Sequence, residues 1–451
     1  MTGEVTAAVT AAVTNENVRA LAAELRDLLG AENVSADAAA LERASVDGAR
    51  LSPIIVEQLP LGRAELVAWP TSAELIAATV AAAVRHRVPV TPRGKGTGNY
   101  GQAIPMSGGL VLDTTRARAI VEFGEGYVVV EAGVPMAKIE HEANARGQQV
   151  LMYPSTANSS IGGFLSGGSG GTGSIRHGML HQDFALALDV VHADGEGTLV
   201  HVEGADAEPY IHNYGTAGII ARAKIALEPL QPWRGFFASF DTFEQALSVI
   251  RPFAELEPTP RLVSADPPVL AAALPADEGI PAGRASLRAI LDEASLPAAT
   301  ALVEQAGGRV ELVREGTQAM LKISRISYNH PIEWLQKSHP GRYFHVEVAG
   351  DALVDRIAEV ERVYVGGMLH IEAQKGRPIG MLAGIYSSAQ EVYDGFDKLT
   401  ELGVGFHNCH QWYVDYQPER TAELARTTDP LGLLNPGKLQ QELTVRTGRQ
   451  A

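Results

Sequence analysis

Apolar side chains recur at helical spacing in two stretches of the first 90 residues. In the first stretch Val18, Leu21, Leu25 and Leu28 share one face, and Gly30 follows as a helix stop. The pattern predicts a helix that ends at Gly30, after a start rich in alanine and small polar residues.

The stretch after residue 70 is the stronger helix signal. Thr71 is expected to cap this helix, and Glu74 completes a capping box. The buried face is expected to consist of Leu75, Ile76, Thr79, Val80, Ala83 and Val84. A short strand at 88–91 would then lead into a glycine-rich loop.

The middle of the chain alternates short apolar runs with glycine-rich stretches. We expect strands at 109–115, 119–123 and 127–133, a helix at 135–147, and further strands at 186–194, 197–204 and 220–230. A second glycine-rich loop is expected at 159–178.

The character of the sequence changes near Pro229 and Pro232, after which glycine clusters become sparse. Helical and strand patterns then alternate, as at 243–253 and 343–350. We therefore divide the chain into an N-terminal tail and helix (1–34), a glycine-rich domain (35–230), a second domain (231–410) and a returning segment (411–451).

Composition and charge narrow the class of protein. The 451 residues are 45% hydrophobic and 20% charged, which is typical of a globular protein. A net charge of −16 argues against nucleic acid or an anionic membrane as partner, so a small molecule is expected. Cys409 stands alone, which excludes an intrachain disulfide, and no apolar run is long enough to span a membrane. We expect a cytoplasmic enzyme, with an oligomer possible.

The glycine-rich loop at 90–102 raises two familiar possibilities, and neither fits. A Walker A loop needs glycine where Pro89 stands, and Ser or Thr where Gly96 follows Lys95. Residues 96–101 match the spacing of a dinucleotide fingerprint, but Pro105 stands where the required helix should run. The loop therefore needs another explanation, and its glycines would let backbone N–H groups approach a ligand closely.

Four sequence blocks supply that explanation. They are PRGKGTGNYGQ (92–102), YPSTANSSIGGFLSGGSGGTGSIRHG (153–178), YGTAGIIARAKIALEP (214–229) and DPLGLLNPGKL (429–439). Their order and spacing resemble the FAD-linked oxidase family of the vanillyl-alcohol oxidase and para-cresol methylhydroxylase (PCMH) type. Within that family they are nearest in style to glycolate oxidase and D-2-hydroxyacid dehydrogenase-like members. The resemblance implies an α+β fold, in which a two-subdomain PCMH-type FAD-binding domain carries an inserted α+β substrate cap domain.

The resemblance also implies which residues would bind FAD. The pyrophosphate would lie on the first block, at Arg93, Gly94, Lys95, Gly96, Thr97 and Gly98, with Gln102 close by. The second block would line the isoalloxazine and diphosphate through Pro154, Ser155, Thr156, Gly162, Gly163, Ser166, Gly167 and Gly168. Gly218 and Ile219 would contact the adenine, and Asn435 would lie near the flavin edge.

The expected mode of FAD attachment depends on whether the first glycine-rich loop contains a histidine. Family members that attach FAD through the first loop use a histidine near the positions that Gly96 and Thr97 occupy in this chain. Others use a histidine from the cap, for which His407 or His410 would be available. Non-covalent FAD is expected.

Two clusters are candidates for the chemistry. The first contains His410, which could accept the proton of a substrate hydroxyl. The second contains Arg325, Tyr328, Asn329 and His330, where His330 could accept that proton and Arg325 could bind a carboxylate. The second cluster could equally consist of satisfied polar groups on an ordinary strand.

A metal is the alternative use of the first cluster. His407, Cys409 and His410 lie within four residues, and Glu372 could add a ligand. On a strand His407 and Cys409 would share a face and His410 would point away, so one ion could not easily bind all three. No metal is expected.

The predicted function is FAD-dependent transfer of a hydride from a small 2-hydroxy acid or related alcohol to flavin N5. Ala132 ends a strand that approaches the flavin in the resembling family, and its methyl group would hinder O₂. A dehydrogenase with an unknown electron acceptor is therefore favoured over an oxidase. Two alternatives are an oxidase or lyase acting on a larger amine, phenol or natural product, and a non-catalytic subunit of an oxidoreductase complex.

Overall fold

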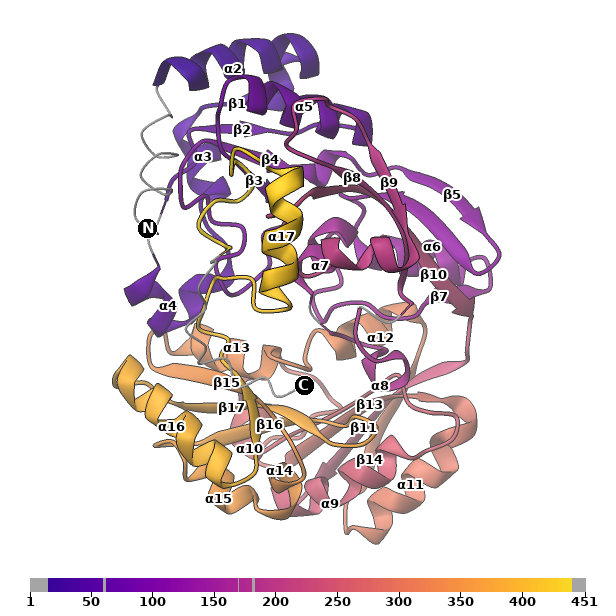
Figure 1. The fold of residues 1–451 in the computed structure, drawn as a ribbon. Coiled ribbons are helices and arrows are strands. Elements are labelled where there is room, and N and C mark those ends of the chain that lie inside the picture. The colour runs from indigo at the N-terminus through magenta and orange to yellow at the C-terminus, as the bar shows by residue number, and fades with distance from the viewer. Residues whose placement is uncertain (1–14, 60–61, 169, 181–182, 440–451) are drawn as a thin grey trace.

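The strands form three sheets that follow one another along the chain. The computed structural model describes residues 15–59, 62–168, 170–180 and 183–439. Figure 1 shows the first two sheets in the upper half of the molecule and the third sheet in the lower half. We call strands β1–β10 with their helices (residues 15–229) the N-terminal region, and strands β11–β18 with theirs (residues 233–407) the cap.

The first sheet has the strand order β1-β2-β4-β3. Its strands are β1 (Val34–Ser35), β2 (Leu66–Ala68), β3 (Val90–Arg93) and β4 (Leu110–Asp113). Its helices are α2 (Asn15–Leu29), α3 (Ala38–Ala44), α4 (Pro53–Gln58) and α5 (Ala73–Arg85). The strands β2, β4 and β3 are parallel, and helices pack on both faces, which explains their continuous apolar sequences.

The two N-terminal helices form where expected, but details of both differ from the prediction. Leu28 is 38% exposed and Leu29 is buried in its place. The cap of α5 is Ser72, whose Oγ accepts a hydrogen bond from the N–H of Leu75, and Thr71 is exposed. Of the predicted buried face of α5, Ile76, Thr79, Val80 and Ala83 are buried, and Leu75 and Val84 are partly buried, while four further alanines complete the face.

The second sheet is antiparallel and has the order β5-β6-β10-β8-β9, with β7 also paired to β10. Its strands are β5 (Ile120–Gly124), β6 (Tyr127–Glu131), β7 (Gln148–Val150), β8 (Ala185–Val191), β9 (Val200–Glu203) and β10 (Ile219–Pro229). Its helices are α6 (Met136–Asn144), α7 (Ile161–Gly167) and α8 (Ser174–His177). The long central strand β10 alternates buried and half-buried residues, because α7 packs on one face of the sheet.

The cap is built on the third sheet, whose order is β14-β11-β13-β12-β16-β17-β15-β18. Its strands are β11 (Trp233–Phe240), β12 (Leu262–Asp266), β13 (Ala285–Asp292), β14 (Arg309–Glu315), β15 (Tyr343–Ala349), β16 (Met368–Glu372), β17 (Ile379–Ile385) and β18 (Gly405–His407). All of its strand pairs are antiparallel.

Helices cover both faces of the cap sheet. Those packed on the face away from the N-terminal region are α9 (Phe243–Ala254), α11 (Leu296–Gln305), α14 (Ala352–Asp355), α15 (Ile357–Glu361) and α16 (Ala389–Glu401). Those on the opposite face are α10 (Pro268–Ala273), α12 (Thr317–Ser324) and α13 (His330–Ser338). Within the described ranges, no helix combines the length and the apolar composition needed to cross a bilayer.

After the cap the chain returns to the first sheet. Helix α17 (Pro418–Thr428) runs back beside the N-terminal region, as Figure 1 shows in yellow. Leu434 then forms a parallel bridge with Val90, and the N–H of Asn435 donates to the carbonyl of Val90. The chain after the cap therefore lies against the first sheet of the N-terminal region, with neither helix nor strand at 429–439.

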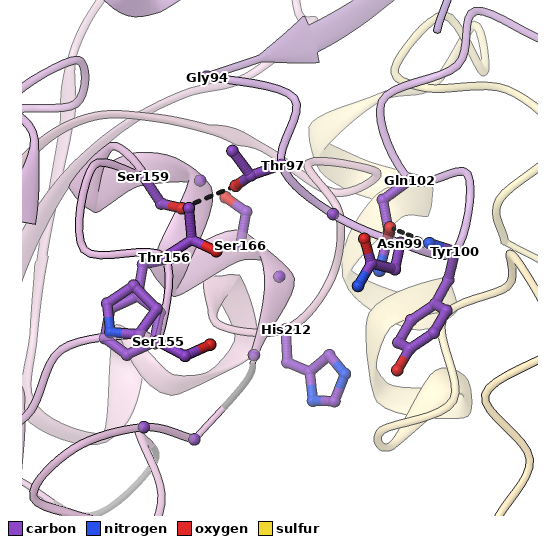
Figure 2. Close-up of a pocket in the computed structure, with 18 of the residues that line it drawn as sticks. Gly94, Thr97, Asn99, Tyr100, Gln102, Ser155, Thr156, Ser159, Ser166 and His212 are labelled. Carbon is purple, nitrogen blue, oxygen red and sulfur yellow. Dashed lines mark hydrogen bonds between the residues drawn. The ribbon is translucent and has the colours of Figure 1, made fainter. Parts of the chain in front are cut away.

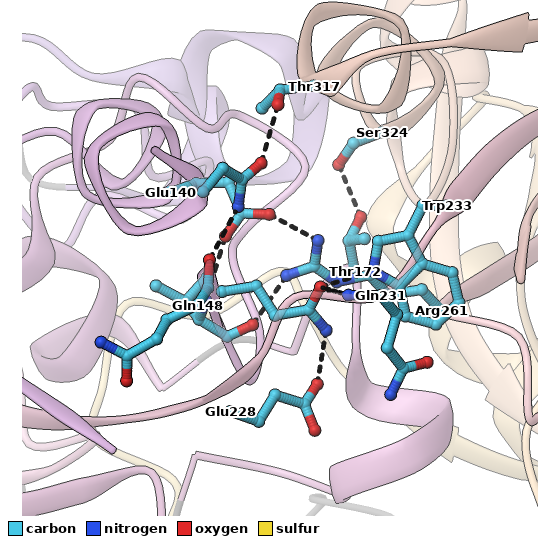
Figure 3. Close-up of polar contacts among 12 residues, drawn as sticks. Glu140, Gln148, Thr172, Glu228, Gln231, Trp233, Arg261, Thr317 and Ser324 are labelled. Carbon is cyan, nitrogen blue, oxygen red and sulfur yellow. Dashed lines mark hydrogen bonds and ion pairs between the residues drawn. The ribbon is translucent and has the colours of Figure 1, made fainter. Parts of the chain in front are cut away.

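A buried arginine fastens the cap to the N-terminal region. Arg261 precedes β12 and is 1% exposed. Its guanidinium donates to the Glu140 carboxylate on α6 at 2.5 Å and to the carbonyl of Val150 at 2.7 Å (Figure 3). Because breaking such a pair would leave a buried charge without a partner, this contact strongly favours one seating of the cap.

Further polar contacts lie near Arg261 in Figure 3. The Trp233 indole donates to Gln149, Thr317 donates to Asn144, and Thr172 pairs with Ser324 at 2.8 Å. Thr172 lies in the second glycine-rich segment, so the cap is tied directly to a segment that lines the cavity described next.

Candidate functional site

A cavity of about 490 Å³ lies where the N-terminal region meets the cap. Its lining includes the residues that follow β3, the segment around α7 and α8, and side chains of the cap. Figure 2 shows Asn99, Tyr100 and Gln102 on one side of it and Ser155, Thr156 and Ser166 on the other. The size is that of a typical ligand pocket.

The loop at 94–102 offers a row of backbone donors. Within the described chain, the N–H groups of residues 95–99 donate no hydrogen bond to the protein. Gly96 has a φ of 63°, and a Cβ there would lie 2.0 Å from the Arg93 guanidinium. Consecutive N–H groups without protein acceptors are a typical cradle for phosphate, so the loop fits a diphosphate.

The segment at 159–178 is not simply the loop that the sequence predicted. It contains α7 and α8, since Ser160 caps α7 and the glycines permit tight turns around both helices. A side-chain hydrogen bond of 2.7 Å between Thr97 and Ser159 joins this segment to the first loop (Figure 2). The two glycine-rich blocks therefore form one continuous wall.

At two positions of this wall, close packing leaves no room for a side chain, which explains why glycine is found there. A Cβ on Gly162 would lie 2.7 Å from the Cβ of Ala132, and one on Gly168 would lie 1.9 Å from Cγ of His212. Gly168 also has a φ of 69°. Ala132 is fully buried directly behind Gly162, and it is not itself part of the cavity lining.

Most of the residues predicted to bind FAD line this cavity. They are Arg93, Gly94, Lys95, Gly96, Thr97, Gly98, Gln102, Pro154, Ser155, Thr156, Gly162, Gly163, Ser166, Gly167, Gly168 and Ile219. Gly218 and Asn435 are not in the lining. The Asn435 amide instead donates to the carbonyls of Gln102 and Tyr214, so it fixes two segments that do line the cavity.

Of the five residues predicted to be catalytic, two line the cavity and three do not. Tyr328 and Asn329 line the cavity. Tyr328 has a φ of 58°, and its N–H donates to Glu372 at 2.6 Å. The Asn329 amide donates to Glu333 at 2.7 Å. These residues lie between two helices, α12 and α13, and not on the strand that the sequence left open.

The other three predicted catalytic residues lie outside the lining. Arg325 is exposed at the end of α12 and cannot clamp a substrate in the cavity. His330 lies 3.3 Å from Thr156 and 3.3 Å from Glu333. His410 is 2% exposed, with Nδ1 at 2.8 Å from Ser52 Oγ, and burial lowers its pKa to about 3.

A chain of polar contacts that we did not predict crosses the site. Tyr100 donates to Glu347 at 3.0 Å, and Glu347 also contacts His407 at 2.9 Å. The other ring nitrogen of His407 contacts Asp415, which lies 3.3 Å from His212. Four of the five residues line the cavity, and Asp415 connects them from behind. They come from distant parts of the sequence, so no local motif could have revealed the chain.

The two carboxylates keep His407 charged. Burial alone would lower the pKa of His407, but Glu347 and Asp415 outweigh it and raise that pKa to about 9. Burial likewise opposes ionisation of Glu347, yet His407 and Tyr100 lower its pKa to about 2. The pKa of Asp415 is lowered too, by His212 and His407. Near neutral pH the site therefore contains an imidazolium between two carboxylates.

The residues considered as metal ligands do not converge. His407 contacts Glu347 and Asp415, and Cys409 lies 3.3 Å from the carbonyl of His345. Glu372 contacts His370, in a separate cluster. Among the described residues, no group of three or more His, Cys, Asp or Glu side chains has an arrangement that could hold an ion.

Comparison with known proteins identifies the fold and the cofactor. Residues 64–202 match the model of an FAD binding domain. The chain therefore contains an FAD-binding domain of this type. FAD is therefore its cofactor, and the wall of unpaired N–H groups and close-packed glycines fits the diphosphate of that molecule.

The curated relatives match only part of the chain. An uncharacterized FAD-linked oxidoreductase of Mycobacterium tuberculosis is 28% identical over 219 residues, 47% of this chain and 44% of that protein. Glycolate oxidase subunit GlcD of Bacillus subtilis is 32% identical over 178 residues, 37% of each chain. This chain thus spans less than half the length of these relatives.

The fold as a whole matches solved structures. One of an alkyldihydroxyacetonephosphate synthase superposes with a TM-score of 0.74 at 16% identity, covering 95% of this chain and 86% of the other. The predicted PCMH-type FAD-binding fold of mixed helix and sheet is confirmed.

Proposed function

We propose that this protein is an FAD-dependent oxidoreductase that oxidises a CH–OH group of a small hydroxy acid or related alcohol. The observation that carries the proposal is a single cavity lined by both the N–H groups of residues 95–99 and the Glu347–His407 pair. The relation to a glycolate oxidase subunit supports the reaction type.

The residues of the N-terminal wall have the role of binding FAD. The N–H groups at 95–99 would bind its diphosphate, and the segment 154–168 would line the rest of the cofactor. When bound, FAD supplies the acceptor for the hydride of the substrate C–H bond. Both ring nitrogens of His407 are engaged and His410 lies outside the lining, which supports non-covalent binding.

Glu347 is the group best placed to accept the hydroxyl proton. Its carboxylate lines the cavity, while Tyr100 and His407 hold its two oxygens. Its low pKa does not prevent this role, because a hydroxyl becomes strongly acidic as its carbon loses a hydride. The proton arrives at a carboxylate oxygen of Glu347, and His407 holds that oxygen in place.

The purified protein tests the proposal directly. We expect a yellow protein whose flavin spectrum bleaches under anaerobic conditions with one class in a panel of hydroxy acids and alcohols. Acid precipitation should release the colour into solution, since attachment is non-covalent. A colourless protein that takes up no added FAD would favour a non-catalytic subunit, and bleaching only by amines or phenols would reject CH–OH oxidation.

A further inference from the structure

We propose that the substrate is a neutral polyhydroxylated alcohol and not a 2-hydroxy acid. This inference rests on the proposed function and makes its substrate class specific. We call the cavity-lining residues of the cap, together with the adjacent Asn99 and Tyr100, the cap wall. The inference depends on which polar groups of this wall already have hydrogen-bond partners and which remain available. The cap residues in the wall are Tyr328, Asn329, Glu333, Glu347, Gln374, Ile379, Met381 and His407.

The charged groups of the cap wall are already paired. Glu347 accepts hydrogen bonds from Tyr100 and His407. Glu333, 8% exposed in its side chain, accepts from Asn99 at 2.6 Å and from Asn329 at 2.7 Å. Lys337 and His330 lie 3.3 Å from the same carboxylate. Neither carboxylate therefore needs a cationic substrate.

A carboxylate substrate would lack a cationic partner here. Among the described residues of the cap, no arginine or lysine lines the cavity, and Arg325 is exposed elsewhere. The charged His407 does line it, but both of its ring nitrogens are already engaged by Glu347 and Asp415. Arg93 and Lys95 belong to the loop assigned to the FAD diphosphate. A substrate carboxylate would thus be buried near Glu333 and Glu347 without a counter-charge, which is strongly unfavourable.

The groups that remain available are neutral. Gln374 lines the cavity, and its amide has no hydrogen-bond partner in the described chain. Asn329 and Asn99 use their amide nitrogens on Glu333, which leaves both carbonyl oxygens as acceptors. The Tyr100 oxygen can also accept while its hydrogen is donated to Glu347.

This set matches hydroxyl groups, each of which donates one hydrogen bond and accepts others. A chain of adjacent hydroxyls could pair with the two carbonyl oxygens, the Gln374 amide and Tyr100. Ile379 and Met381 supply apolar surface for its carbon backbone. The geometry thus favours a polyol over the acids that the name of the GlcD relative suggests.

Matched substrate pairs test the inference on the FAD-loaded protein. We would measure anaerobic bleaching with 1,2-ethanediol against glycolate, 1,2-propanediol against lactate, and glucitol against gluconate. The neutral member of each pair should bleach the flavin at least about tenfold more efficiently. Faster bleaching by the acids would overturn the substrate class but not CH–OH oxidation. If no compound of the panel bleaches the flavin while dithionite still does, the proposed function itself is rejected.

Variants at one position separate recognition from folding. Gln374→Met should lower polyol efficiency about tenfold, since it removes the free amide and keeps the length of the side chain. Gln374→Arg should lower polyol efficiency and raise that of the acids, because it adds the missing cation. Arg377→Gln, exposed in the same turn and outside the lining, is the control and should change neither. Equal effects on acids and polyols in both Gln374 variants would contradict the inference.

Discussion

The two walls of the cavity are built by different means. The N-terminal wall consists mainly of backbone: glycines that allow close approach, and N–H groups of residues 95–99 without protein acceptors. The cap wall consists of side chains, most of which hold one another in place, as Glu347 and His407 do. The first wall suits a large cofactor with a diphosphate, and the second suits a small ligand recognised by a few polar groups.

A second comparison shows why residue type alone does not identify a site. His370 contacts Asp266 and Glu372, each at 2.8 Å, and its pKa is raised to about 9 despite burial, as for His407. All three of those residues are buried in the cap, beside Arg288. Only the histidine that reaches the cavity can act on a ligand, so position separates the two clusters.

The largest effect is expected on the backbone wall. Gly96→Leu should yield folded protein without FAD, because the new side chain meets Arg93 and enters the loop that we propose binds the diphosphate. The measurement is the flavin absorbance per protein after purification. Gly147→Leu is the matched control, since Gly147 has a similar φ of 70° and open space around it. Full FAD occupancy in Gly96→Leu would show that the cofactor lies elsewhere.

On the cap wall, Glu347→Gln should slow anaerobic flavin reduction by about 10²- to 10⁴-fold and leave FAD bound. The substitution removes the carboxylate that we propose accepts the proton and keeps the shape of the side chain. His410→Gln should leave the rate nearly unchanged, because His410 lies outside the lining. Glu372→Gln places the same change in the enclosed cluster and should affect stability and not the rate. A native rate of flavin reduction in Glu347→Gln, or a slow rate in His410→Gln, would show that Glu347 is not the base.

These expectations also show how far the sequence could lead. The N-terminal lining of the cavity could be predicted because its glycines are close together in sequence and their spacing resembles that of FAD-linked oxidases. The chain of contacts proposed to handle the proton could not, because Tyr100, Glu347 and the stretch with His407 and Asp415 are three distant segments that only the folded cap and the returning tail bring together. Arg325 and His410 were predicted as catalytic from their residue types alone. In the structure Arg325 is exposed and His410 is buried, and neither lines the cavity.

A smaller effect than on either wall is expected at Ala132, which lies one layer behind the backbone wall. Its Cβ faces Gly162, which lines the cavity, so removing the methyl group opens space directly behind the lining. We expect slow reoxidation of the native reduced protein by air, as in a dehydrogenase. Ala132→Gly should accelerate it about tenfold, a change of about 1.4 kcal/mol in the barrier. Rapid peroxide formation by the native protein would make it an oxidase and remove this role.

The last expected effect is a dependence of stability on pH, and it applies to both histidine clusters. The folded pKa of His407 is about 9, above its ordinary value of 6.5, so its stabilisation is complete below about pH 6.5 and is lost as pH rises through 9. Glu347, with a folded pKa of about 2, loses its contribution as pH falls from about 4.5 through 2. The pair should therefore stabilise the protein most near pH 4.5 to 6.5, by up to about 3 kcal/mol.

Denaturant unfolding of the native protein and of His407→Gln, from pH 5 to 10, measures this contribution as a difference in unfolding free energy. The difference should shrink as pH rises, and His370→Gln should show the same trend, because the pKa of His370 is also raised to about 9. Only the His407 substitution should also slow flavin reduction. A difference that grows with pH would mean that His407 is neutral in the folded protein, and the charged link between Glu347 and Asp415 would then have to be abandoned.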